Sequence, residues 1–336
     1  MNTLLIVMAA WSCPAFDQPE LTGSVDNSDL GEASGLVHIA STEGFWAHND
    51  SGDRARLFAF DRSGKDLGQL ILEGVDALDW EDLSAGPCGS SRCLFIGDMG
   101  DNGARRSEIL IHRLIEPAPP GEGQSTSVEV ETMRAVYPSG AIDAEGLAVD
   151  PQTGDVFIIT KNRREPISSV YVLRSSSWGS SEPVTLESIG RLSWDGNGLA
   201  TLATAAAIEP SGQELFVQTY TQGQRVELVR EQGRVTSLGN QTFFMPWSLG
   251  QCEAMAFADE GQSMWFTCEA VPAPIARAKC LTEPPPNLDP SPGPTVPPAE
   301  FGCGGCQSNS QISWITLLLF ALRGRAKGVE STRRSL

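Results

Sequence analysis

One sequence pattern recurs five times between residues 17 and 282, and this repetition restricts the fold more than any other feature. Each copy contains an apolar segment, a turn, and a second segment rich in β-branched and aromatic residues. The clearest copies begin at Asp143-Ala-Glu-Gly-Leu and Cys252-Glu-Ala-Met-Ala. The equivalent position of the five copies, the anchor position, is occupied by Ser34, Glu81, Glu145, Thr204 and Glu253. Successive anchors are 47, 64, 59 and 49 residues apart.

The composition of each copy predicts strands, because β-branched and aromatic residues separated by turn residues are typical of short antiparallel strands. Further apolar segments, such as 56–60, 109–112, 170–173 and 226–229, predict a third strand in each of the first four copies. Repeats of about 40–50 residues are typical of propeller blades. Closing such units into a ring covers their apolar faces and most of their edges. The sequence therefore predicts an all-β fold, a five-bladed β-propeller with four antiparallel strands per blade, while the 64-residue interval leaves room for a sixth blade.

The last copy lacks a fourth strand before the chain becomes proline-rich. The segment 21–25, which precedes the first copy, has no earlier blade to join. We therefore expect the N-terminal strand to complete the last blade and to close the ring.

Eight cysteines in a chain expected to be exported favour disulfide bonds over metal thiolates. Cys88 and Cys93 flank a predicted turn, and antiparallel pairing brings Cys252 close to Cys268. This leaves Cys280, for which Cys13 beside the closing strand is the predicted partner unless Cys13 carries a lipid.

Residues 1–13 resemble a secretory signal, since a short apolar segment over 4–11 precedes small residues. The segment is shorter than the roughly 20 residues that cross a membrane. Ala10-Trp11-Ser12-Cys13 also resembles a lipoprotein box, so a lipoprotein signal is the alternative. No Lys or Arg precedes Arg54, so the basic start of a typical signal is missing and the translation start could lie upstream.

Residues 283–300 contain eight prolines and predict an extended linker. Residues 301–336 contain a Gly-Cys motif, a short apolar segment over 312–322, and a basic end. This order resembles the MYXO-CTERM class of sorting tails in myxobacteria and their relatives. The resemblance implies processing and anchoring at Cys303 or Cys306 by sorting machinery, with the protein held at the membrane and exposed at the cell surface or in the envelope.

The net charge of −18 argues against a nucleic-acid partner. The charge is uneven, because residues 323–336 carry +4 and the rest of the chain carries −22. An acidic body with a basic end fits an exported domain whose last residues stay on the cytoplasmic side.

Carboxylates gather at one predicted end of the propeller, where inner strands begin and second strands end. We call this end the channel mouth. The candidate metal ligands are Asp50, Glu81, Asp82, Asp98, Glu145, Glu253 and Glu269. The other residues predicted to line the mouth are His48, Asn49, Arg54, Asp101, Asn102, Arg106, Lys161, Arg164 and Tyr220, with Asp53, Asp79, Asp143 and Arg163 nearby.

So many carboxylates at one mouth repel one another unless cations compensate them. Either Lys161 and the arginines neutralise them and simply hold the ring, or a hard cation such as Ca²⁺ binds their oxygens. Ca²⁺ is the cofactor predicted here, and no other cofactor is expected.

Two functions remain open. The segments His48-Asn-Asp-Ser-Gly52, Asp79-Trp-Glu-Asp82, Gly97-Asp-Met-Gly-Asp-Asn102 and Asp143-Ala-Glu-Gly-Leu147 resemble the broad group of bacterial propellers that includes phytase-like esterases, lactonases and strictosidine-synthase relatives. The resemblance implies Ca²⁺ and acidic residues at the mouth but assigns no catalytic residue, and the Gly-x-Ser-x-Gly motif is absent. The favoured function is a binding or scaffold module for an unidentified small molecule or surface ligand. The alternative is a Ca²⁺-dependent phosphoesterase or lactonase.

Overall fold

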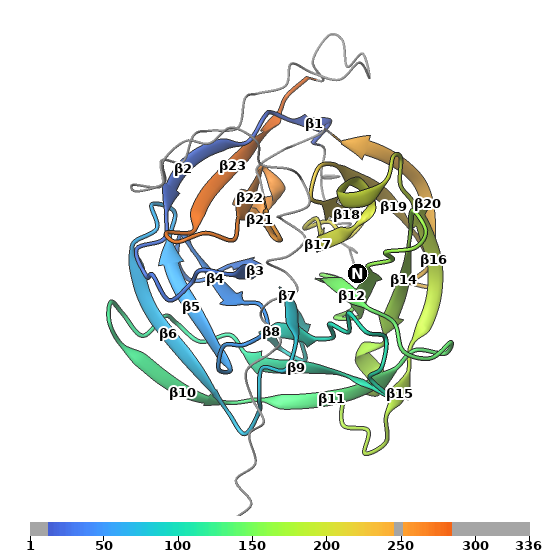
Figure 1. The fold of residues 1–336 in the computed structure, drawn as a ribbon, viewed down its shortest axis with the longest axis horizontal. Coiled ribbons are helices and arrows are strands. Elements are labelled where there is room, and N and C mark those ends of the chain that lie inside the picture. The colour runs from blue at the N-terminus through green and yellow to red at the C-terminus, as the bar shows by residue number, and fades with distance from the viewer. Residues whose placement is uncertain (1–12, 245–250, 284–336) are drawn as a thin grey trace, which may run out of the picture. The chain divides into compact units, whose positions relative to one another are not determined.

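The computed structural model describes residues 13–244 and 251–283, which form five β-sheets around a central axis (Figure 1). The fold is a five-bladed β-propeller, as the repeat predicts. Residues 1–12 of the signal predicted over 1–13, the linker beyond residue 283, and Cys303 and Cys306 lie outside the described residues. No helix in the described part of the chain is long and apolar enough to cross a membrane.

Four blades follow the chain in order, each with its first strand nearest the axis and its last strand outermost. Blade 1 contains β3 (Ala33–His38), β4 (Gly44–Asn49), β5 (Arg56–Asp61) and β6 (Asp66–Glu73). Blade 2 contains β7 (Trp80–Cys88), β8 (Ser91–Asp98), β9 (Ile109–Ile115) and β11 (Glu131–Val136). Blade 3 contains β12 (Ala144–Val149), β13 (Val156–Thr160), β14 (Ile167–Leu173) and β16 (Glu187–Ser193). Blade 4 contains β17 (Ala203–Ile208), β18 (Glu214–Thr219), β19 (Gly223–Glu231) and β20 (Arg234–Phe244).

Blade 5 combines both ends of the propeller domain. Its inner strands are β21 (Ala254–Ala258), β22 (Ser263–Thr267) and β23 (Pro274–Leu281). The N-terminal strands β1 (Ala15–Phe16) and β2 (Glu20–Ser24) both pair antiparallel with β23, so these two strands lie along its outer edge (Figure 1). The ring is thus closed by hydrogen bonds between segments far apart in the sequence, such as Glu20 opposite Arg277.

Two long connections explain the 64- and 59-residue intervals without a sixth blade. The connection from β9 to β11 contains β10 (Ser125–Glu129), which pairs in parallel with β6 of the preceding blade. The connection from β14 to β16 contains β15 (Val184–Thr185), which pairs in parallel with β11. The remaining elements are short 3₁₀ turns, η1 (Ser175–Ser177), η2 (Gly198–Thr201) and η3 (Asp259–Gly261). The extra residues therefore join neighbouring blades at the rim.

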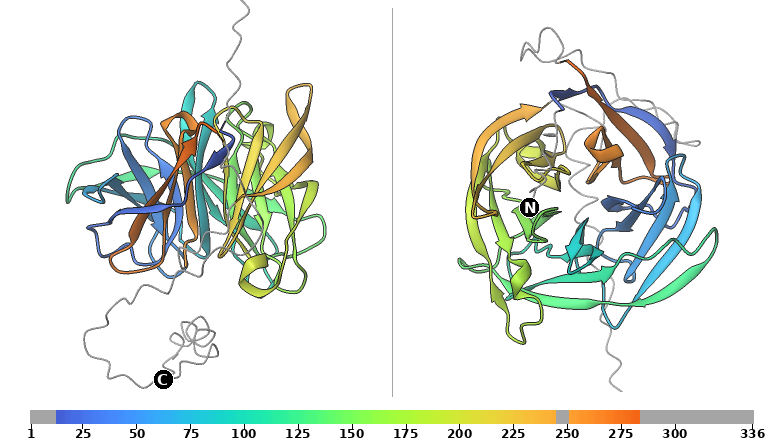
Figure 2. Two further views of the ribbon diagram at one scale, coloured as in Figure 1. Left: turned by 90° about the horizontal axis from the view of Figure 1, so that it is seen from above. Right: turned by 180° about the vertical axis from the view of Figure 1, so that it is seen from behind.

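The apolar core is divided among the interfaces between neighbouring blades. The left view of Figure 2 shows the blades edge-on. Between blades 5 and 1, for example, Phe45 lies 5.0 Å from Trp265, measured between ring centres. Trp46 and Trp80 are fully buried between blades 1 and 2. Because each blade covers its neighbours, the burial that stabilises the fold depends on the closed ring.

All three predicted disulfides are present, joining Cys13 to Cys280, Cys88 to Cys93, and Cys252 to Cys268. The first of them ties the N-terminal segment to the end of β23. This is the pairing predicted for a Cys13 that carries no lipid.

Candidate functional site

The anchor residues lie where the inner strands start, and in four blades the anchor is the extra residue of a β-bulge. In blades 1 to 4 the pairing of the inner strand with the second strand skips Ser34, Glu81, Glu145 and Thr204. A bulge inserts one extra residue and re-aims side chains, and such bulges often lie beside functional sites. Glu253 immediately precedes β21 at the same level. All five anchor side chains are buried.

A second repeat position faces the same mouth. The backbone N–H groups of Asp50, Met99, Lys161 and Glu269 each donate to the carbonyl oxygen of the residue two positions before the anchor, at 2.8, 3.1, 3.0 and 2.9 Å. This shared bond shows that the four residues are equivalent in their blades. Tyr220, directly after β18, is the corresponding residue of blade 4. Blade 2 therefore contributes the buried Met99 at this position rather than the predicted Asp98.

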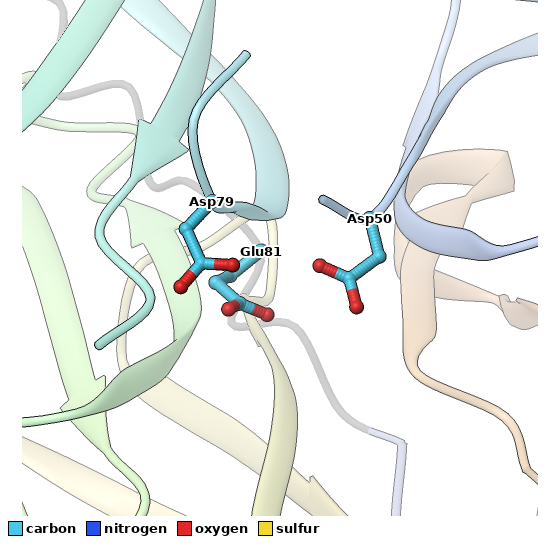
Figure 3. A group of neighbouring side chains, drawn as sticks. All are labelled: Asp50, Asp79 and Glu81. Carbon is cyan, nitrogen blue, oxygen red and sulfur yellow. The ribbon is translucent and has the colours of Figure 1, made fainter. Parts of the chain in front are cut away.

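Three carboxylates from two blades converge on one part of the mouth. Asp50 follows β4, whereas Asp79 and Glu81 lie at the start of β7, and Figure 3 shows their side chains turned toward a common space. One carboxylate oxygen from each lies within 4.8 Å of those of the other two. Asp50 and Asp79 are partly exposed and Glu81 is buried, so the group has access from solvent.

A second group of three adjoins the first and shares Glu81. It is completed by Asp143 and Glu145 from blade 3, again with ligand oxygens within 4.8 Å of one another. The Glu81 Oε2 atom has no hydrogen-bond partner although the residue is only 2% exposed. A buried polar atom without a partner is costly, so this oxygen is available to bind a cation or a water molecule.

Burial and mutual repulsion disfavour the charged forms of several carboxylates at the mouth. Burial, together with repulsion from Glu145 and Asp50, raises the pKa of Glu81 well above its usual range. Burial and neighbouring carboxylates also raise the pKa of Asp50 to about 7 and that of Glu269 to about 8. Burial and the Glu145 charge raise the pKa of Asp143. Clusters of strongly shifted groups in a cleft are typical of functional sites.

On the side of the mouth formed by blades 3 and 4, a lysine side chain supplies positive charge. Lys161 Nζ lies 3.0 Å from Glu145 Oε1 and 3.3 Å from the Tyr220 hydroxyl, which donates to Glu253. Burial lowers the pKa of Lys161, but the charges of Glu145 and Glu253 outweigh it and raise this pKa well above its usual value. Arg163 Nη2 lies 3.4 Å from Asp143 Oδ2 and 3.8 Å from Glu145 Oε1. Positive side chains that neutralise mouth carboxylates are therefore present, as predicted, on the side formed by blades 3 and 4.

Four of the seven predicted ligands lie outside both groups, namely Asp82, Asp98, Glu253 and Glu269. Asp98 is fully buried, and its carboxylate accepts a 2.7 Å bond from Arg106 Nη1. Burial raises its pKa, but His112, Arg106 and nearby N–H groups outweigh burial and lower it. Asp82 is also fully buried, and its Oδ2 accepts N–H bonds from Leu147 at 2.8 Å and Ala206 at 3.0 Å. Asp98 thus anchors Arg106, and Asp82 ties β7 to two other inner strands.

The remaining predicted mouth residues shape loops or face solvent. His48 is buried, with its Nδ1 2.8 Å from the Asn49 carbonyl oxygen, and burial lowers its pKa to about 4. Asn49 accepts N–H bonds from Gly31 and Glu32. Asp101 accepts N–H bonds from Arg105 and Arg106. Asn102 is exposed and accepts a hydrogen bond from Arg163. Arg54 and Arg164 are exposed, and among the described residues no ion pair joins either to a carboxylate.

The far end of the channel differs from the mouth in its chemistry. A cavity of about 710 Å³ opens there, lined by apolar residues such as Leu83 and Met255 and by charged residues such as Glu43, Arg92 and Asp259. Asp82 lies one residue before Leu83 on β7, between Glu81 and this lining. The acidic mouth and this cavity of mixed lining are therefore separate environments.

Comparison with known proteins leaves the family open. No protein-family model and no curated protein matches the chain. Among solved structures, a gluconolactonase from Xanthomonas campestris is similar at 11% identity and a TM-score of 0.42, over 79% of this chain and 95% of that one. A putative glucose dehydrogenase from Thermus thermophilus gives 13% identity and a TM-score of 0.42, over 79% and 100% of the two chains. An auxiliary nutrient binding protein from Bacteroides thetaiotaomicron is similar at 7% identity and a TM-score of 0.43, over 79% of this chain and 77% of that one. Similarity at this level assigns neither a family nor an activity.

Proposed function

We propose that the propeller is an extracytoplasmic binding module whose channel mouth holds one divalent cation, Ca²⁺, through Asp50, Asp79 and Glu81. The observation that carries the proposal is the convergence of these three carboxylates around the unpartnered Oε2 of buried Glu81. Ca²⁺ prefers such all-oxygen ligands and tolerates irregular geometry. The cation would then bind an anionic or oxygen-rich group of the ligand.

The charge balance of the mouth supports this proposal. The two groups contain five different carboxylates, Asp50, Asp79, Glu81, Asp143 and Glu145. Lys161 and Arg163 contact the blade 3 members, Asp143 and Glu145. No ion pair with Lys or Arg is found for Asp50 or Glu81 in the described part of the chain. A divalent cation would remove the repulsion on that side. The three disulfides support the placement of the domain outside the cytoplasm.

Calcium should therefore raise the melting temperature of the full chain, and chelator should lower it. At 100 times the dissociation constant, a ligand that binds only the folded state adds about 2.7 kcal/mol to the free energy of unfolding. Glu81→Gln should abolish most of the difference between Ca²⁺ and chelator without destabilising the protein in chelator, because it removes a buried charge. Thermal melts of both proteins test this expectation.

Glu43→Gln is the matched control, since Glu43 lies in the turn between β3 and β4 at the opposite end of the propeller. It removes the same charge and should keep the full response to Ca²⁺. Identical wild-type melting curves with Ca²⁺ and with chelator would contradict the proposal.

A Ca²⁺-dependent hydrolase is the second candidate, and the raised pKa of Glu269 favours it. Glu269, which is not one of the three proposed Ca²⁺ ligands and has a pKa of about 8, is suited to accept or donate a proton near neutral pH. The cation would polarise a phosphoryl or lactone carbonyl oxygen. A panel of phosphate esters and lactones should then show turnover that requires Ca²⁺ and is lost in Glu81→Gln. Calcium binding without turnover on the panel would leave the binding module as the function.

A further inference from the structure

The two carboxylate groups of the mouth form a pair of adjacent cation positions, only one of which is open. Both contain Glu81, whose two oxygens can serve two neighbouring ions. Paired metal sites in proteins are about 3.5–4 Å apart and commonly share such bridging ligands. The group Asp50, Asp79 and Glu81 is the open position. The group Glu81, Asp143 and Glu145 is the second position.

We propose that Lys161 is a built-in substitute for a second cation, and that it limits the channel mouth to one divalent ion. This inference rests on the proposed function of the same mouth. It assigns the second position as a latent metal site, which becomes available when the ammonium group is removed.

The contacts of Lys161 place its charge where a metal ion would be needed. Its Nζ lies 3.0 Å from Glu145 Oε1, a member of the second position. The side chain is only 4% exposed, and its amine also lies 3.3 Å from the Tyr220 hydroxyl and 5.2 Å from the centre of the Tyr220 ring. A side chain enclosed in this way cannot swing into solvent when a cation arrives.

The repeat shows that the lysine is particular to blade 3. The equivalent residues of the other blades are Asp50, Met99, Tyr220 and Glu269, none of which carries a positive charge. The ring geometry therefore does not require a cation at this point. What distinguishes blade 3 is the neighbouring group of three buried carboxylates.

Arg163 plays a lesser part. It contacts Asp143 and Glu145 at longer range, 3.4 and 3.8 Å, and its side chain is 45% exposed. An exposed arginine can move aside, so its charge alone would not exclude an ion.

The test is the number of Ca²⁺ ions bound per full-length chain, measured by isothermal titration calorimetry on wild type and Lys161→Met. Methionine has a similar length and no charge. Wild type should bind one Ca²⁺, and Lys161→Met should bind two. The first ion should also bind about tenfold or more tightly in the variant, because a nearby positive charge no longer opposes it.

Two further variants control the result. Lys161→Met/Glu145→Gln removes both members of the ion pair and should return the count to one. Arg163→Gln should leave the count at one. Circular dichroism and melting in Ca²⁺ establish that each variant is folded. If the single variant does not fold without Ca²⁺, it is purified in Ca²⁺ and the bound metal is counted by elemental analysis after gel filtration.

The outcomes separate this inference from the proposed function. A wild type that binds no Ca²⁺ would refute the proposed function itself. One ion in both wild type and Lys161→Met would refute only the role of Lys161. Two ions in wild type, or two in the double variant, would also refute it.

Discussion

Replacing Cys13 and Cys280 together by Ser should lower the free energy of unfolding by about 5 kcal/mol, a large fraction of the stability of a typical domain. The bond joins residues 267 positions apart, so its loss releases nearly the whole propeller from one constraint. It also frees β1 and β2, which complete blade 5 along β23. Urea unfolding followed by circular dichroism measures the change.

Cys88→Ser with Cys93→Ser is the internal control. That bond spans only five positions within one hairpin of blade 2, so its loss should cost about 2 kcal/mol. Equal losses in the two double variants would contradict the idea that the first bond acts by holding the ring closed.

Arg106→Met should lower the free energy of unfolding by about 3–5 kcal/mol. The change leaves the fully buried Asp98 carboxylate without the guanidinium that lies 2.7 Å from it, and breaking a buried ion pair from one side carries a cost of this size. Arg134→Met is the control, because Arg134 and Glu108 form a pair at 2.8 Å whose side chains are 48% and 30% exposed. That change should cost about 1 kcal/mol or less.

The Arg106 effect should depend on pH with a definite sign. The pKa of Asp98 is lowered in the folded protein, so its contribution is fully present above the unfolded value, near 3.9, and is lost as pH falls through the folded value. The difference between wild type and Arg106→Met should therefore be large at pH 7 and shrink below about pH 4. A difference that stays constant down to pH 3 would indicate that Arg106 stabilises by packing alone.

The five blades could be predicted from the sequence because each copy of the repeat keeps the same order of strand and turn segments. Aligning the five copies also gives the anchor position. The alignment also contains a signal for Asp79 and Asp143 as ligands, since both lie two residues before an anchor, in consecutive copies. Asp98, predicted as a ligand, lies outside both carboxylate groups, because the end of β8 puts Met99 rather than Asp98 at the repeat position equivalent to Asp50.

Other features of the site depend on contacts between blades that a repeat pattern does not contain. Asp82 occupies a position that holds Gly or Ala in the other blades, and its partners Leu147 and Ala206 come from two different inner strands. Arg163 rather than Arg164 reaches the carboxylates of blade 3. Which of two neighbouring arginines turns inward is decided by the loop that carries them.

The most direct measurement is the calcium bound by the purified full-length protein in equilibrium dialysis against millimolar free Ca²⁺ at neutral pH, determined by elemental analysis of both compartments. We expect one bound Ca²⁺ per chain, retained in Glu43→Gln and lost in Glu81→Gln. Wild-type protein that retains no calcium, or a Glu81→Gln variant that retains as much as wild type, would contradict this expectation.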